Sequence, residues 1–236
     1  MLHRLVKWAL TPWVWGLYRL LGGLRAEGQE NIPATGAAIL APNHLSWTDP
    51  PALGLVIPRN CWFMANDFLF RIPVMGKLIP YLRAFPVHRG RLDRDALRTA
   101  EEHLKNQDLL CVFPEGGTTI TGVLYPFEGG VALLALRNNV PIVPVAITGS
   151  DKVLPMKEPY RLHYARGGIR IRFGKPIHPS EIGADLPRRE RVDLITAQLY
   201  HAVAELLPPE YLPAELHRYE IETEKEMAAN EREWER

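Results

Sequence analysis

The amino-acid sequence predicts an α/β fold: a single domain with a mostly parallel or mixed central sheet, flanked by helices, plus N-terminal amphipathic membrane-associating helices. Three observations lead to this prediction. Short β-rich runs alternate with segments of helical period along most of the chain. The β-rich runs are almost continuously apolar, as in strands that are buried on both faces. The chain has 236 residues, 47% of them hydrophobic, which is enough for one sizeable core.

Composition divides the chain into three segments. We expect an interfacial amphipathic region at residues 1–25, the main domain at residues 26–210 and a charged C-terminal helix or tail at residues 211–236. The formal net charge is +1, so no global charge points to nucleic acid. Cys61 and Cys111 each lie in an apolar run, which indicates buried reduced thiols and the cytoplasmic side of a membrane.

The first element is the segment "MLHRLVKWALTPWVWGLYRLLGGL". Its uncharged stretch, Trp8 to Tyr18, is shorter than the ~20 residues that cross a bilayer, and Pro12 interrupts it. Its aromatic and basic residues suit the headgroup region, so we expect peripheral or monotopic attachment through an interfacial helix or a helix pair bent at Pro12. Gly22 and Gly23 should end it. The alternative is a helix that packs on the core of the domain.

The remaining elements follow in alternation. Strands are predicted at residues 37–41, 61–65, 84–88, 109–113, 142–148 and 169–173. Helices are predicted at residues 50–56, 73–79, 93–106, 130–138 and 190–207. Asp93 is the candidate N-cap of the third of these helices. The segment Ala214 to Arg236 has many charges and few apolar residues, which indicates a solvated or frayed helix.

The stretch "APNHLSWTDP" places Asn43 and His44 at the end of the first predicted strand and Asp49 just before a helix start at Pro50. A turn of this length lets the Asp49 carboxylate reach one imidazole nitrogen of His44, which leaves the other nitrogen free to take a proton. The pair would then be a general base and its orienting partner. The alternative for these residues alone is an N-cap Asp49 beside a structural histidine.

A second stretch, "LLCVFPEGGTTITG", also follows a predicted strand. Gly116 and Gly117 would let backbone N–H groups approach a phosphate or an oxyanion, and Glu115 could bind an acceptor hydroxyl. The alternative is a plain glycine turn with an exposed glutamate. A third stretch, "AFPVHRG", brings Arg89 to another strand end, where an arginine is most often solvated.

In this order the stretches resemble the glycerolipid acyltransferase family typified by the 1-acyl-sn-glycerol-3-phosphate acyltransferases. The resemblance runs from about Asn31 to Pro176, and "NHLSWTDP", "FPVHRG", "VFPEGG" and "VPIVPVAITG" match four family blocks. It implies that His44 is the general base and Asp49 its partner. The acceptor-binding residues that it implies are Arg89, Glu115, Gly116, Gly117 and Thr118. The supporting residues that it implies are Asn43, Phe113, Pro114 and Pro144.

The resemblance implies transfer of a fatty acyl group from a thioester, acyl-CoA or acyl carrier protein, to a lysophosphatidic acid-like acceptor in phospholipid biosynthesis. The reaction would run at a membrane surface in an acyltransferase domain at residues 26–210, without a cofactor, a metal or nucleic acid. His44 would deprotonate the acceptor hydroxyl, backbone N–H groups near Gly116 would stabilise the oxyanion, and no acyl-enzyme would form.

Three other functions stay open from the sequence. The acceptor could be another lysophospholipid or polar lipid. A serine hydrolase could form an acyl-serine on Ser46, although no Gly-x-Ser-x-Gly elbow surrounds this residue. A non-catalytic lipid-binding protein could use the same blocks only to build a pocket.

Three positions depart from the family pattern, and each departure removes a cation. Thr118 stands in the block-three segment where the family usually has an arginine, and Glu128 stands where a lysine is common. Asn66 stands where many relatives carry a lysine. A phosphomonoester carries close to two negative charges near neutral pH, so we expect weaker binding of lysophosphatidic acid than in the family's usual members, although this lipid remains the first acceptor to consider.

Overall fold

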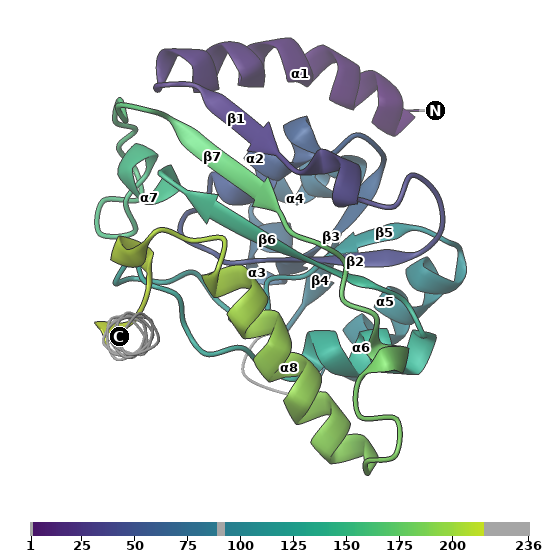
Figure 1. The fold of residues 1–236 in the computed structure, drawn as a ribbon. Coiled ribbons are helices and arrows are strands. Elements are labelled where there is room, and N and C mark those ends of the chain that lie inside the picture. Colours follow the sequence, from purple (N-terminus) through teal and green to yellow (C-terminus); the bar gives the residue numbers. More distant parts are fainter. Residues whose placement is uncertain (1, 89–92, 215–236) are drawn as a thin grey trace, which may run out of the picture.

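A computed structural model describes residues 2–88 and 93–214, whose strands form one mixed sheet of seven (Figure 1). The strands are β1 (Leu24–Glu27), β2 (Ala38–Pro42), β3 (Cys61–Asn66), β4 (Ala84–Val87), β5 (Leu109–Cys111), β6 (Ile142–Thr148) and β7 (Ile169–Phe173). Their order is β1-β7-β6-β2-β5-β3-β4, with β6 and β7 antiparallel and the other neighbours parallel. This confirms the predicted α/β fold with a mixed sheet.

The helices of the described residues lie before, between and after these strands. The α-helices are α1 (Leu2–Leu20), α2 (Asp49–Val56), α3 (Phe68–Arg71), α4 (Met75–Leu78), α5 (Arg94–Lys105), α6 (Gly130–Asn138), α7 (Ser150–Val153) and α8 (Arg188–Ala204). Short 3-10 helices are η1 (Gln29–Asn31), η2 (Ile79–Leu82), η3 (Pro179–Glu181) and η4 (Pro209–Tyr211).

Each face of the sheet has its own apolar core. Successive residues of a strand point to opposite faces. Ile39 of β2 therefore joins the core with residues of α5, α6 and α8, whereas Leu40 joins the core with residues of α1 and α2. Both side chains are fully buried, and each such burial contributes roughly 1.5–3 kcal/mol to folding. Double-sided burial explains why the central strands are continuous apolar runs in the sequence.

Most predicted elements agree with the structure, and two regions differ. The bounds of β6, β7 and α6 coincide with the predicted ones, and Asp93 caps α5 by accepting the N–H groups of Asp95 and Ala96. Strand β1 is not among the predicted strands, because its four residues show one buried apolar side chain, Leu24. The helix predicted at residues 73–79 is shorter than expected: α4 covers residues 75–78, and η2, which contains Pro80, begins at Ile79. Helix α3 precedes Pro73 and is not among the predicted helices.

Helix α1 is one continuous helix through Pro12, so the bent helix pair is not observed. It ends at Leu20, before Gly22 and Gly23, whose φ values of 117° and 101° suit glycine. Tyr18 is buried on the core, and its hydroxyl donates to the Thr48 carbonyl over 2.7 Å. Part of the helix therefore packs on the domain, in line with the alternative interpretation of this segment.

Two further predictions can be placed on this fold. Cys61 and Cys111 are buried, as expected, and burial raises the pKa of the Cys111 thiol. No helix of residues 2–88 and 93–214 is long and apolar enough to cross a membrane. Residues 215–236 of the predicted C-terminal helix lie outside the described residues.

Candidate active site

The turn that follows β2 begins with Asn43, whose side-chain amide bonds to β6 as a strand backbone would. Asn43 Nδ2 donates to the Ile147 carbonyl over 3.0 Å, and Asn43 Oδ1 accepts the Ile147 N–H over 2.7 Å. These two bonds reproduce the donor and acceptor that a backbone residue would present to β6. The pairing between β2 and β6 therefore continues for one residue while the main chain turns away from the sheet toward His44.

His44 and Asp49 form the contact that the sequence predicts. His44 Nδ1 lies 2.8 Å from Asp49 Oδ2, and the Asp49 side chain is 0% exposed. The same Oδ2 atom accepts the backbone N–H groups of Leu45 and Ser46, each over 2.8 Å. Asp49 is the first residue of α2, whose N-cap is Thr48, so its carboxylate holds the turn and the imidazole instead of capping the helix.

The second nitrogen of His44 is left free by this arrangement. Within the described part of the chain, His44 Nε2 has no hydrogen-bond partner, and it is not among the fully buried polar atoms that lack one. The ring stacks on Phe113, with centroids 4.0 Å apart and an interplanar angle of 25°. Asp49 and Phe113 together fix the ring, so Nε2 is positioned to accept a proton from a bound hydroxyl.

Glu115 joins the turn after β2 to the turn after β5 through its carboxylate. Its Oε1 accepts the His44 N–H over 2.7 Å, and its Oε2 accepts the Tyr125 N–H over 3.2 Å. Burial raises the pKa of Glu115 to about 8, although these two backbone donors act in the opposite direction. Because both oxygens are occupied, Glu115 braces the backbone of the turn that carries His44 in this structure. Its acceptor-binding role stays a prediction.

The glycine turn after Glu115 lies directly beside His44. Thr119 N–H donates to the His44 carbonyl over 2.8 Å, and Gly116 N–H donates to the Phe113 carbonyl over 3.1 Å. The Gly116 amide is therefore occupied. The N–H groups of Gly117 and Thr118 have no hydrogen-bond partner within the described residues, which leaves them available to a ligand.

Ser46 does not suit a nucleophile in this arrangement. It is fully buried, its Oγ donates to the Leu154 carbonyl over 2.9 Å, and the same Oγ lies 3.3 Å from the Thr48 N–H. A hydroxyl that attacks a carbonyl must be exposed to the substrate and contact a base. The structure therefore argues against the acyl-serine alternative.

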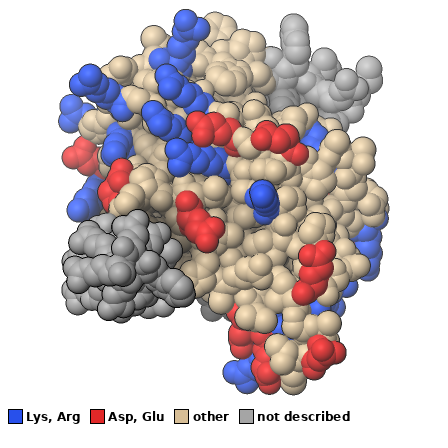
Figure 2. Space-filling view, in the orientation of Figure 1, with Lys and Arg blue, Asp and Glu red and all other residues tan. Residues whose placement is uncertain are grey.

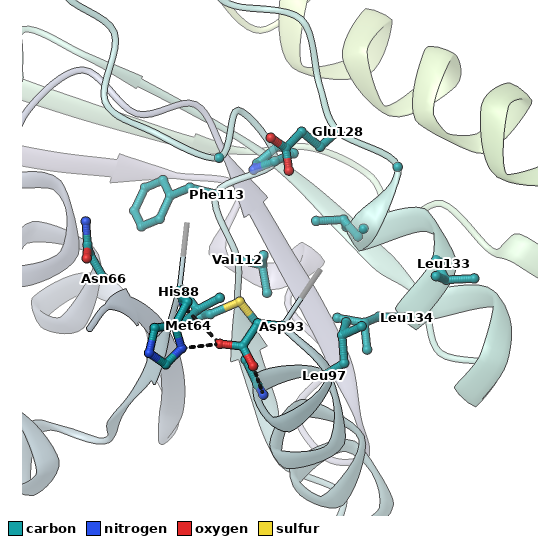
Figure 3. Close-up of a pocket in the computed structure, with 17 residues that line it drawn as sticks. Met64, Asn66, His88, Asp93, Leu97, Val112, Phe113, Glu128, Leu133 and Leu134 are labelled. Atoms are coloured by element: carbon teal, nitrogen blue, oxygen red, sulfur yellow. Dashed lines mark hydrogen bonds and ion pairs between the residues drawn. The ribbon is translucent and has the colours of Figure 1, made fainter. Parts of the chain in front are cut away.

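Residues 112–129, between β5 and α6, form a loop that we call the Phe113 loop. An open cleft of about 580 Å³ lies beside this loop (Figure 3). One part of its lining is apolar and comes from β3, the residue after β5, α5 and α6, and the labelled side chains there include Met64, Leu97, Val112 and Leu134. Phe113, Pro114 and Gly116 also line it. His44 is not in the lining, and Phe113 connects the two by stacking on the imidazole.

Several polar residues that matter to the sequence prediction meet in this cleft. Asn66 and Glu128, two of the positions that lack a family cation, both line it, whereas Thr118 does not. His88 and Asp93 line it too, and sequence reasoning missed them as site residues although the His-x-x-x-x-Asp spacing recurs there. Arg89 lies outside the described residues, so its acceptor-binding role stays a prediction.

Pro144 is placed in the sheet and not in the cleft. It is a buried residue of β6, opposite Ala41 of β2, and its carbonyl accepts the Gly174 N–H over 2.8 Å. The antiparallel ladder with β7 begins at the next residue, Val145. Pro144 therefore supports the strand that Asn43 contacts.

Comparison with known proteins identifies the relatives of this chain. Residues 23–148 match the family model described as Acyltransferase. The chain is 29% identical over 188 residues to the 1-acyl-sn-glycerol-3-phosphate acyltransferase of Bacillus subtilis, covering 79% of this chain and 89% of that one. It is 31% identical over 183 residues to the lyso-ornithine lipid O-acyltransferase of Pseudomonas aeruginosa, covering 71% and 69%.

A solved structure with a similar fold is the 1-acyl-sn-glycerophosphate (LPA) acyltransferase PlsC from Thermotoga maritima. The TM-score is 0.68 at 27% sequence identity, over 86% of this chain and 80% of that chain.

Proposed function

Because this chain belongs to the acyltransferase family, we propose that it moves a fatty acyl group from a thioester donor to the hydroxyl of a lysophosphatidic acid-like acceptor in phospholipid biosynthesis. The donor is acyl-CoA or acyl carrier protein. One observation carries the proposal: His44 Nδ1 is held by a buried Asp49, while its Nε2 has no partner within the described part of the chain. That is the state of a general base awaiting a hydroxyl.

The reaction that fits these groups needs no covalent enzyme intermediate. His44 Nε2 takes the proton of the acceptor hydroxyl while its oxygen attacks the thioester carbonyl carbon. Asp49 stabilises the resulting imidazolium through Nδ1. The tetrahedral intermediate then collapses, the carbon–sulfur bond breaks, and the proton passes from His44 to the departing thiolate.

The oxyanion of that intermediate needs hydrogen-bond donors close to His44. The N–H groups of Gly117 and Thr118 are the candidates, since the amides on either side of them, those of Gly116 and Thr119, already donate to carbonyls. The proposed donors thus move by one residue from the position near Gly116 that the sequence favours.

The cleft supports the acyl part of the proposal. Its apolar walls from α5 and α6 suit a hydrocarbon chain, and Phe113, which stacks on His44, lines the same cleft (Figure 3). An acyl chain in the apolar part would place its thioester toward the loop beside His44. The relatives are named for two different acceptors, so the family serves more than one head group.

We also propose peripheral or monotopic attachment to the cytoplasmic face of a membrane. The outer side of α1 carries Trp13 and Leu20, which are 79% and 77% exposed. Figure 2 shows Lys and Arg side chains gathered over the region of β1 and β7, where Arg25 and Arg170 are exposed. Aromatic and apolar residues beside a basic surface suit an anionic bilayer.

The membrane proposal is tested on vesicles with Trp13→Ala plus Leu20→Ala, which leave the buried Tyr18 in place. We expect weaker sedimentation with anionic vesicles, and weaker binding of the unaltered protein at high salt because salt screens the basic surface. Unchanged sedimentation of the double variant would show that α1 serves only the fold.

The catalytic proposal is tested by mixing the purified protein with a labelled acyl-CoA and lysophosphatidic acid in detergent. Free thiol and a diacyl product should appear in equal amounts, and acyl carrier protein replaces CoA in a parallel reaction. The His44→Ala protein is the control. A lipid-binding protein would release no thiol, and release without diacyl product would indicate a thioesterase.

A further inference from the structure

The charge of the cleft differs from what a phosphomonoester requires. The described residues that line it include no arginine or lysine, and the ionisable ones are His88, Asp93 and Glu128. A phosphomonoester near pH 7 carries about 1.5–2 negative charges and is normally held by cations. The described lining therefore offers a dianionic head group two carboxylates and no permanent cation.

The two carboxylates of the cleft are not equivalent. Asp93 Oδ2 accepts the backbone N–H and lies 2.7 Å from Nδ1 of His88, while its Oδ1 accepts the N–H groups of Asp95 and Ala96. These backbone bonds lower the pKa of Asp93 and occupy both oxygens. The Glu128 carboxylate has no hydrogen bond or ion pair within the described part of the chain. Glu128 is the carboxylate that a ligand can use.

The position of Glu128 is set by the loop that follows β5. Its N–H donates to the Pro114 carbonyl over 2.8 Å. Its carboxylate lies over Gly116, where an added Cβ would lie 2.7 Å from Glu128 Oε1. Gly116 directly follows Glu115, which braces the N–H of His44. A group that binds Glu128 is therefore held beside the loop that supports the general base.

We propose that Glu128 determines the acceptor head group: its carboxylate pairs with an ammonium group of the lysolipid, and the enzyme prefers such acceptors to phosphomonoesters. This inference rests on the proposed acyl transfer and narrows its lysophosphatidic acid-like acceptor to a lysophospholipid that carries an amine. A phosphodiester that carries an amine suits this cleft for two reasons. Its ammonium offsets the Glu128 charge, and its phosphate has one negative charge, which is less than that of a phosphomonoester. Glu128 is exposed, so the pairing is screened and its effect on rate is modest.

The test compares three lysolipids with the same acyl chain and different head groups. One is a phosphomonoester, one is a phosphodiester of glycerol and one is a phosphodiester of ethanolamine. The glycerol and ethanolamine lipids differ in the ammonium, so their ratio of kcat/KM isolates it. We expect the wild type to prefer the ethanolamine lipid by about three- to tenfold over the glycerol lipid, with the phosphomonoester last.

Substitutions at Glu128 should change this ratio in a graded way. Glu128→Gln keeps the shape and removes the charge, so the ratio should fall to about one. Glu128→Lys should favour the phosphomonoester. Glu102→Gln is the matched control, because it removes a charge from an exposed position of α5 outside the cleft lining, and it should leave the ratio unchanged. Thermal unfolding of each variant shows whether it is folded.

Failure of this inference can be told apart from failure of the proposed function. If the lipids are acylated and Glu128→Gln keeps the wild-type ratio, the head-group inference is overturned while acyl transfer stands. If no lipid is acylated, the proposed function fails, and equilibrium binding of the three lipids to wild type and Glu128→Gln then decides the inference. A head-group preference in binding that Glu128→Gln removes supports it, and equal preferences in both proteins overturn it.

Discussion

Two turns of this protein repeat one pattern and have different chemistry. In each, a histidine follows the end of a strand and an aspartate follows at the same spacing, where a helix begins. His44 comes after β2 and Asp49 is the first residue of α2, whereas His88 comes after β4 and Asp93 is the N-cap of α5. The imidazole Nδ1 lies 2.8 Å from the carboxylate in the first pair and 2.7 Å in the second. Spacing and contact distance therefore do not distinguish them.

The difference lies in the other imidazole nitrogen. His88 Nε2 faces Asp67 Oδ2 at 3.5 Å, so carboxylates flank this ring on both sides, and its side chain is 44% exposed. His44 has a side chain that is 7% exposed and stacks on Phe113, and its Nε2 lacks a partner within the described residues. A histidine that acts as a general base needs an oriented ring and a second nitrogen that has no hydrogen-bond or ion-pair partner in the protein.

The aspartates differ in a parallel way. Asp93 is the N-cap of α5, so its carboxylate serves the helix as well as the histidine.

A third pair at this spacing, His103 and Asp108, is 3.2 Å apart at the far end of α5, just before β5 begins. It lies at the amino end of β5, the opposite edge from His44, and its ring stacks on Trp62.

The largest expected effect separates the two histidines directly. His44→Ala should lower kcat by about 10²- to 10⁴-fold because a positioned base is lost. His88→Ala should lower kcat by less than about fivefold, since its ring contacts carboxylates on both sides. Initial rates at saturating substrate check both, with circular dichroism to confirm folding. Equal losses in the two variants would contradict the distinction drawn from Nε2.

The two aspartates should differ next. Asp49→Asn keeps an oxygen that can accept the N–H groups of Leu45 and Ser46 and removes the charge beside His44. We expect about a 10- to 100-fold loss in kcat, smaller than for His44→Ala. Asp93→Asn should leave kcat within about threefold, because asparagine is also a good N-cap. A loss in kcat for Asp93→Asn as large as that for Asp49→Asn would show that the second pair takes part in catalysis.

Gly116→Ala should lower kcat/KM by an intermediate amount, because it alters the loop whose Glu115 contacts the His44 N–H. The φ of Gly116 is +66°, and a Cβ would lie 2.7 Å from Glu128 Oε1, so alanine strains the backbone and displaces the carboxylate. We expect about a tenfold loss in kcat/KM. Gly122→Ala is the control for strain alone: its φ is +82° and a Cβ there meets nothing within 4 Å. Comparable losses in kcat/KM would assign the effect to backbone strain.

The smallest effect concerns the free energy of unfolding. The pKa of Glu115 is about 8, against an ordinary value of 4.5, so between these pH values the folded protein holds a proton that the unfolded chain releases. The free energy of unfolding should therefore fall as pH rises across this window, by at most about 1.4 kcal/mol per pH unit.

Urea unfolding of wild type and Glu115→Gln at several pH values checks this dependence. The glutamine variant should lose this contribution, although its amide can accept only one of the two backbone donors and its overall stability will be lower. Glu128→Gln, which alters an exposed carboxylate, should keep the wild-type slope. An unchanged slope in Glu115→Gln would show that the proton resides elsewhere.

Much of the fold was predictable because burial on both faces leaves a strong mark on sequence. The run that forms β6 is apolar, and β7 alternates buried apolar residues with Arg170 and Arg172, so the ends of both could be located. Strand β1 could not be predicted, since Leu24 is its one buried residue and its pairing with β7 joins segments far apart in the chain. The short helices between Phe68 and Leu82 depend on two prolines whose local effects do not predict a path.

The site was predictable in its ionisable pair and less so in its surroundings. The strand-to-helix turn brings His44 and Asp49 together locally, so spacing sufficed. The bond from Glu115 to the His44 N–H joins residues 71 positions apart, and only the fold brings them together. The role of Ser46 likewise depends on the Leu154 carbonyl. From the sequence alone a serine beside His44 could be a nucleophile, and only its hydrogen-bond partner in the fold shows that Ser46 is structural.

The Asn43 side chain has a consequence for how such a turn could be transplanted. Asn43 clamps the start of the turn to Ile147, and Asp49 clamps its end to Leu45 and Ser46. The geometry of the segment is thus carried by two short side chains and one neighbouring strand, while Trp47 between them is half exposed. Residues 43–49 could be transferred as a unit to another parallel sheet, provided that the adjacent strand extends two residues beyond the end of the strand that carries the turn. Aspartate could not replace Asn43 there, because it lacks the donor that reaches the Ile147 carbonyl.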